Sequence, residues 1–215
     1  MFSVRGKALY TKMDFLFKMI GEILNSSKLE DTKRLYEIVA SVKSRAQVNL
    51  TGAGHSTAVL RAAAYSSPMA AFQDEMAGIG YYQFIEKLEK DFEQRKEETV
   101  EELCKLMKEI LRPENFMISY TGERESLEIV QKLAGAVKAG LGTEPVEKSK
   151  EKLTCTKKNE GFKTSGQVQY VAQTGNFKKK GLEYTGALEI LKVILSYDYL
   201  WMNLRVKGGA YGCIC

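Results

Sequence analysis

Histidine, cysteine and long apolar runs are all scarce in this sequence of 215 residues, and each scarcity limits what the chain can do. His55 is the single histidine, so no second imidazole is present to share a metal ion with it. Cys104, Cys155, Cys213 and Cys215 are few and irregularly spaced, which favours free thiols in a reducing compartment, the cytoplasm or an organelle interior, over a disulfide framework. No apolar run reaches the roughly 18 residues that indicate a membrane span.

Charge and composition are ordinary. Apolar residues make up 44% and charged residues 27% of the sequence, as in soluble globular proteins. The net charge of +5 comes partly from lysine clusters at 148–158 and 178–180. No aromatic-rich RNA signature or zinc finger accompanies either cluster. We therefore expect a solvated basic surface, with neither a nucleic acid nor a membrane as partner.

The first two thirds of the chain is dominated by helical periodicity. Apolar residues at three- and four-residue steps predict helices over 7–25 and, after a cap at Asp31, over the next twenty residues. The core-facing stripe of that second helix is expected at Leu35, Ile38, Val39, Val42 and Ala46. Further helices are predicted over 57–65, from Pro68 onward, over 81–111 and over 123–138.

The stretch Leu50–Ser56 reads as a glycine-containing turn, and it leaves alternatives open. Its Gly-x-Gly could cradle a phosphate, although the full glycine-rich pattern and a preceding strand are lacking. His55 could serve as a general base or metal ligand. The favoured interpretation is a turn histidine that is hydrogen-bonded near a helix start.

Short alternating segments predict strands among the helices. Residues 115–122 and 167–172 alternate in side-chain character, and a third strand is expected to begin near Ala210. A helix that is apolar on nearly every side follows Gly186, which is typical of a buried helix. The expected fold class is therefore α+β, with short strands packed against helices. The Lys- and Glu-rich stretch between 143 and 163 is expected to be a surface connector.

The last sixteen residues, Leu200–Cys215, carry the strongest candidate site. Gly208 and Gly209 are expected to end the helix and turn the chain, so that Arg205 and Tyr211 point at the same place. Both side chains can donate hydrogen bonds to a carbonyl oxygen. The structural alternative is a partly buried arginine and a core tyrosine at a joint between a helix and a strand.

Three stretches together carry a resemblance to a known family. They are LTGAGHSTAVLRAAAYSSP from Leu50, GIGYYQFIEKLEKDFE from Gly78, and the tail from VQYVAQTGNF through YTGALEILKVILSYDYLWMNLRVKGGAYG. The sequence resembles the C-terminal half of the presequence-protease branch of the pitrilysin/insulinase metallopeptidases, over nearly all of its length. The stretch 143–163 matches least.

The resemblance implies four related α+β domains in two halves that close around an unfolded peptide. In that family a His-x-x-Glu-His motif holds zinc in the first domain. An arginine and a tyrosine of the fourth domain hold the substrate backbone near the scissile bond. Arg205 and Tyr211 are the matching positions, beside Gly208 and Gly209. The His-x-x-Glu-His motif is absent here, so the chain should hold no cofactor and be inactive alone, with zinc expected in a missing N-terminal half.

The implied domain organisation has three parts. Residues 1–141 would be the latter part of a third pitrilysin-like domain, 142–160 a connector, and 161–215 the truncated start of a fourth. The expected function is the substrate-binding, non-zinc half of a metalloendopeptidase, with an unstructured peptide and the catalytic half as partners. The alternatives are an inert peptide-binding or scaffold module that associates with a partner half, and an unrelated helical binding protein. Bare apolar surface would also favour self-association.

Overall fold

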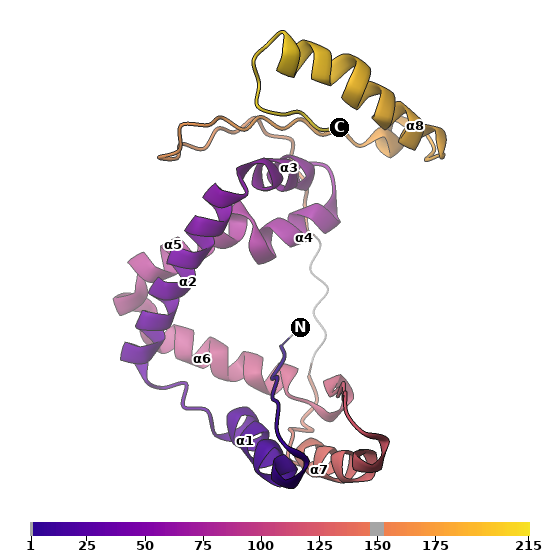
Figure 1. Ribbon diagram of the computed structural model, residues 1–215. Helices are drawn as coiled ribbons and strands as arrows, with labels where there is room; N and C mark the ends of the chain where they lie inside the picture. Colours follow the sequence, from indigo (N-terminus) through magenta and orange to yellow (C-terminus); the bar gives the residue numbers. More distant parts are fainter. Residues whose placement is uncertain (1, 147–152) are drawn as a thin grey trace.

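The computed structural model describes residues 2–146 and 153–215, and in these parts the chain is an arc of helices (Figure 1). The helices α1 and α7 lie at one end of the arc, α2, α5 and α6 form its middle, and α3 and α4 lie at the other end beneath α8 (Figure 1). The bounds are α1 Met13–Ser26, α2 Thr32–Gly52, α3 Gly54–Ala64, α4 Pro68–Ala77, α5 Ile79–Lys90, α6 Phe92–Ile110, α7 Leu127–Ala139 and α8 Ala187–Ile194. A π-helix, η5, continues α8 over Leu195–Val206, and short 3-10 turns cover Tyr10–Lys12, Pro113–Asn115, Arg124–Ser126 and Phe177–Lys180.

The first core joins segments that are distant in sequence. It lies between α1 and α7, and the stretch after α6 packs against it through Phe116 and Tyr120. Its buried members are Met13, Phe17, Leu24, Val130 and Val137. These positions recur at helical spacing on one face of each helix, so burying that stripe is what pairs the two helices.

The second core lies in the middle of the arc, where α2 packs against α5 and α6. Phe92 is its most buried side chain, with 1% exposed, and Val39, Ile85 and Leu88 surround it. The predicted stripe of α2 is confirmed at Val39 and partly at its neighbours, since Leu35 and Val42 pack against this core. Ile38, however, is 45% exposed.

Local capping signals explain where several helices begin. The carboxylate of Asp31 accepts a hydrogen bond from the backbone N–H of Arg34 at 3.0 Å, which confirms the predicted cap. Pro68 occupies the first turn of α4, as expected. The single helix predicted over 81–111 is instead two helices that meet at Asp91. Phe92 follows this break directly and is buried in the second core.

The expected α+β fold class is wrong. Residues 2–146 and 153–215 contain helices and no strand. The segments 115–122, 167–172 and 210–215 run without strand pairing, apart from the 3-10 residue at Asn115. Alternation of side chains describes only the local backbone, whereas a strand also needs a neighbouring chain to satisfy its N–H and C=O groups. The described segments do not supply that neighbour to one another.

The expected burial of the apolar helix is also wrong. No residue of α8 or η5 is buried. Ile190, Tyr197 and Tyr199 are all more than 60% exposed. A helix is buried only where other elements pack along it, and the two parts of this helix pack chiefly against each other, end to end.

The connector is only partly visible. Residues 147–152, which include three of the lysines in the first cluster, lie outside the described residues. Residues 153–176 run without helix or strand up to the turn at Phe177–Lys180. The domain limits at 141, 142–160 and 161 stay predictions.

Candidate functional site

Glycine closes the C-terminal helix as the sequence predicts. Gly209 has a φ of 72°, in the left-handed region that glycine adopts without steric cost. Its N–H donates to the carbonyl oxygen of Arg205 at 3.0 Å, and the N–H of Ala210 donates to that of Leu204, also at 3.0 Å. A Cβ atom on Gly208 would lie 2.7 Å from the Leu204 carbonyl oxygen. The two glycines therefore fix a tight exit from the helix beside Arg205.

Replacing Gly209 with alanine should loosen this exit. The left-handed conformation costs a residue with a Cβ atom about 1 kcal/mol. We expect amide hydrogens of the last turn of η5 to exchange about fivefold faster in Gly209→Ala. Hydrogen exchange followed by mass spectrometry measures this. Gly212→Ala is the matched control, because Gly212 has open space and no positive φ; equal exchange in the two variants would contradict the expectation.

The structure places Arg205 and Tyr211 close in sequence but does not join them. The guanidinium carbon of Arg205 lies 4.1 Å from the centre of the Trp201 ring, one helical turn earlier. In the described part of the chain Arg205 forms no ion pair or side-chain hydrogen bond. Tyr211 is 95% exposed and its hydroxyl has no partner there either. The five N–H donors of Arg205 and the phenol of Tyr211 are thus all available to a ligand.

Sequence reasoning missed the most enclosed polar group of the described residues, the Arg61 cluster (Arg61, Asp74, Glu160 and Tyr65). Arg61 donates from Nη1 to Oδ2 of Asp74 at 2.7 Å, and from Nε and Nη2 to the two carboxylate oxygens of Glu160 at 2.8 and 3.2 Å. The Tyr65 hydroxyl donates to Glu160 as well. Two carboxylates from distant parts of the sequence therefore share one guanidinium.

Asp74 connects this cluster to the start of α5. Its side chain is 1% exposed, and its oxygens accept the backbone N–H groups of Ile79 at 3.0 Å and Gly80 at 3.1 Å. A Cβ atom on Gly78 would lie 2.3 Å from Oδ1 of Asp74, so glycine is needed for this close approach. The predicted bend at Gly78 and Gly80 is thus confirmed, and it has a purpose in the packing of Asp74.

The cluster shifts the ionisation of its members. The Arg61 hydrogen bonds, followed by that of Tyr65, hold the pKa of the Glu160 carboxyl below its ordinary value of 4.5. Burial, followed by the hydrogen bond to Glu160, raises the pKa of the Tyr65 phenol above its ordinary 10.0. Both shifts keep a carboxylate facing a guanidinium and a neutral phenol at neutral pH. The available signal in the sequence was a lone charge in the alanine-rich run AVLRAAA, which periodicity alone reads as a surface residue.

His55 has a structural setting that the sequence did not specify. Its ring lies 6.2 Å from that of Tyr170, centre to centre. A Cβ atom on the neighbouring Gly54 would lie 2.4 Å from the same tyrosine ring. The turn therefore ends in close contact with the segment around Tyr170. Its Gly-x-Gly serves this contact at Gly54, the first residue of α3.

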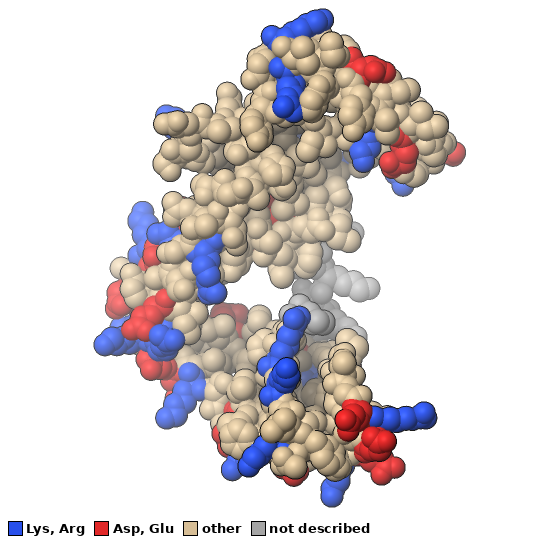
Figure 2. All heavy atoms as spheres, viewed as in Figure 1, with Lys and Arg blue, Asp and Glu red and all other residues tan. Residues whose placement is uncertain are grey.

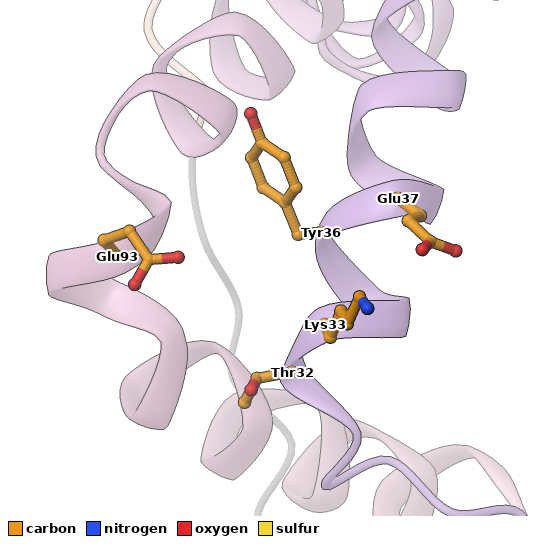
Figure 3. Close-up of a pocket in the computed structure, with 5 residues that line it drawn as sticks. All are labelled: Thr32, Lys33, Tyr36, Glu37 and Glu93. Atoms are coloured by element: carbon orange, nitrogen blue, oxygen red, sulfur yellow. The ribbon is translucent and has the colours of Figure 1, made fainter.

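The hollows of the surface lie elsewhere. One, of about 300 Å³, opens between the starts of α2 and α6, and Figure 3 shows Tyr36 of α2 pointing across it. It is lined by Thr32, Lys33, Tyr36, Glu37 and Glu93. A second begins at Tyr36 and extends along α5. Figure 2 shows charges of both signs gathered over this side of the arc. Neither hollow includes Arg205 or Tyr211.

The chain's residues do not fit a zinc site. In residues 2–146 and 153–215, no three histidine, cysteine or carboxylate side chains gather as metal ligands would. Cys104, Cys155, Cys213 and Cys215 are all free thiols. Within the same residues, no helix is long and apolar enough to cross a membrane.

Comparison with known proteins gives matches at both ends of the chain. Residues 1–88 match a peptidase-associated family of the pitrilysin-type metallopeptidases, and residues 159–215 match the PreP C-terminal domain. Protein HypA of Clostridium perfringens is 35% identical over 206 residues, which cover 96% of this chain and 21% of that protein. Presequence protease 1, chloroplastic/mitochondrial, of Arabidopsis thaliana is 28% identical, with 99% and 20% covered. The mitochondrial presequence protease of Yarrowia lipolytica is 26% identical, with 98% and 22% covered.

These matches agree with the resemblance seen in the sequence. They include both the Leu50–Pro68 stretch and the tail that contains Arg205 and Tyr211. The chain spans about a fifth of the length of the curated relatives it matches. It therefore belongs to the presequence-protease family of the pitrilysin/insulinase metallopeptidases and corresponds to a segment of those longer proteins.

Proposed function

We propose that this chain is the substrate-binding, non-zinc part of a metalloendopeptidase that degrades short unstructured peptides. The observation that carries the proposal is the arrangement at the end of η5. Trp201 holds the guanidinium of Arg205 by its ring face, while every N–H of that guanidinium stays free of the other described residues. An oriented, unpaired arginine on a tight glycine turn is ready to bind a backbone carbonyl.

The chemistry of the pair suits a peptide backbone. A guanidinium and a phenol both donate hydrogen bonds, and a peptide offers one carbonyl acceptor at each residue. When the scissile carbonyl gains negative charge during hydrolysis, donors within hydrogen-bond distance stabilise that charge. Arg205 and Tyr211 would supply this stabilisation. Gly208 and Gly209, which lack side chains, would let the peptide approach closely.

Zinc and the rest of the reaction are assigned outside this sequence. Because the described residues offer no set of metal ligands, the zinc of the family would be held by the catalytic half of the same protein. In that arrangement this chain contributes positioning and hydrogen bonding, and the catalytic half is its natural partner. The compartment is proposed to be a reducing one, with organelle interiors included, since several relatives are named mitochondrial or chloroplastic.

The direct test is cleavage of a quenched fluorescent peptide by this chain, alone and mixed with a separately made zinc-containing N-terminal half. We expect activity only in the mixture, and a chelator should abolish it. If the two halves associate but cleave nothing, the chain would be a binding or scaffold module, and the proposed role of Arg205 and Tyr211 would be wrong. Light scattering of the chain alone tests the expected self-association.

Peptide binding can also be measured without catalysis. Anisotropy of a labelled, unstructured peptide should report binding to the chain, and Arg205→Ala should weaken that binding at least tenfold, the loss of about 1.4 kcal/mol. Lys207→Ala is the matched control. It removes one exposed cation two residues away, which hydrogen-bonds through its side chain to Asn203. Equal losses in both variants would indicate attraction by charge alone.

A further inference from the structure

The C-terminal segment (residues 153–215) contacts the helices before it along a single element. Within the described residues, its hydrogen bonds, ion pair and ring contacts with them fall on α3 and the short turn that follows α3, with Asp74 behind. They join Glu160 to Arg61 and Tyr65, Phe162 to Arg61, Tyr170 to His55 and Gly54, and Asn176 to the carbonyl oxygen of Ser66. Figure 1 shows the segment crossing over α3.

Arg61 is the centre of these contacts. Its side chain is 16% exposed, and it holds Asp74 with one nitrogen and Glu160 with two. The rings of Tyr65 and Phe162 each lie with their centres 5.7 Å from the guanidinium carbon, one from each partner surface. A planar fork with five donors can bind two carboxylates at once, which the point charge of a lysine cannot do with the same geometry.

We propose that Arg61 is a positioning residue whose guanidinium clamps Glu160 to Asp74 and so sets where the C-terminal segment lies against α3. The inference rests on the proposed function for its consequence, because this segment carries Arg205 and Tyr211. The clamp joins the two parts of the chain that match different families, since Arg61 lies within residues 1–88 and Glu160 within residues 159–215.

The segment needs such a clamp because its own backbone provides little order. Between residues 153 and 176 the chain forms neither helix nor strand. An extended stretch of this kind spans many orientations unless side chains hold it. Among the described residues, the first strong attachment after residue 152 is Glu160. Release of Glu160 should therefore free the path into η5, even with every helix intact.

Spin labels measure this placement directly. In a chain whose four native cysteines are serine, labels at Gln47→Cys on α2 and Lys192→Cys on α8 report the distance between the body and the C-terminal helix by pulsed electron resonance. We expect one narrow distance distribution, and its loss in Glu160→Gln and in Arg61→Lys. Glu183→Gln is the matched control, because Glu183 is exposed in the same segment and forms no ion pair with the described residues.

The clamp should also respond to pH in a way that a general packing role would not. Arg61, Asp74, Tyr65 and Lys158 are the charged or titratable groups that face Glu160. The pKa of Glu160 is lowered by these contacts, so its contribution is fully present above the ordinary value of 4.5 and is lost as pH falls through the lowered value. The parent chain should lose its narrow distribution over that range, whereas Glu160→Gln should lack it at every pH.

The outcomes separate the clamp from the proposed function. Circular dichroism checks that each variant retains its helices, so that broadening is not mistaken for unfolding. If Glu160→Gln and Arg61→Lys keep distributions as narrow as the parent, the clamp is overturned, whatever the peptide assay gives. If they broaden while Arg205→Ala binds peptide like the parent, the clamp stands and the peptide-binding function fails. Broadening together with weaker peptide binding in Arg61→Lys supports both.

Discussion

Asp74→Ala is expected to lower the free energy of unfolding by roughly 3 kcal/mol. The carboxylate of Asp74 is 1% exposed and has three partners, namely the guanidinium of Arg61 and the N–H groups of Ile79 and Gly80. Alanine leaves two backbone donors at the start of α5 without an acceptor, and it leaves Arg61 with Glu160 alone. Urea denaturation followed by circular dichroism measures the loss, provided that the slope of the transition is unchanged.

Glu75→Ala is the control for this prediction. Glu75 is the next residue of α4 and is exposed, and surface substitutions of this kind usually stay within about 0.5 kcal/mol. If the two alanine variants unfold at the same urea concentration, the buried carboxylate contributes nothing net. The Arg61 cluster would then be a consequence of the fold rather than one of its supports.

Arg205→Ala in the full-length peptidase should reduce peptide turnover on the order of 10²- to 10³-fold, with the zinc content unchanged. The reason is that a donor aimed at a carbonyl oxygen acts where negative charge develops, in a chamber that excludes water. Arg205→Lys should rescue little, because lysine lacks the fixed fork that can stack on Trp201. Tyr211→Phe should lower turnover by removing the phenol donor alone.

Steady-state kinetics with metal analysis checks this result, and Lys207→Ala again provides the control for lost charge. Wild-type kinetics in both Arg205→Ala and Tyr211→Phe would remove the pair from the mechanism. A loss of zinc in either variant would point instead to a disturbed domain arrangement.

Features encoded within a few residues of one another could be predicted from the sequence. The cap at Asp31, the helix start at Pro68, the bend at Gly78 and the exit at Gly209 each depend on local backbone chemistry, and the structure confirms all four. Helical stripes likewise located most of both cores, because a period of 3.6 residues directly gives the buried face. Ile38 shows the limit, since the width of the stripe depends on the partner helix.

Features that require a distant partner could not be predicted in the same way. The alternating residues of 115–122 and 167–172 suggested strands, but pairing depends on a second segment, which periodicity does not contain. Arg61 meets Glu160 across 99 positions of sequence, and nothing near either residue indicates the other. The apolar character of α8 and η5 was read correctly, but burial is a property of surroundings and not of composition.

The π-helical form of η5 gives the C-terminal helix a way to re-aim its last side chains. A π-helix bonds each N–H to the carbonyl five residues back and therefore turns less per residue than an α-helix, and it is rarely sustained over a length such as Leu195–Val206. Conversion of this stretch to α-helical bonding would rotate Arg205 about the helix axis relative to α8. The same conversion would lengthen the helix, since the α-helix rises further per residue. Both movements take place without any change at Gly186, so the helix acts like a screw that is fixed at one end.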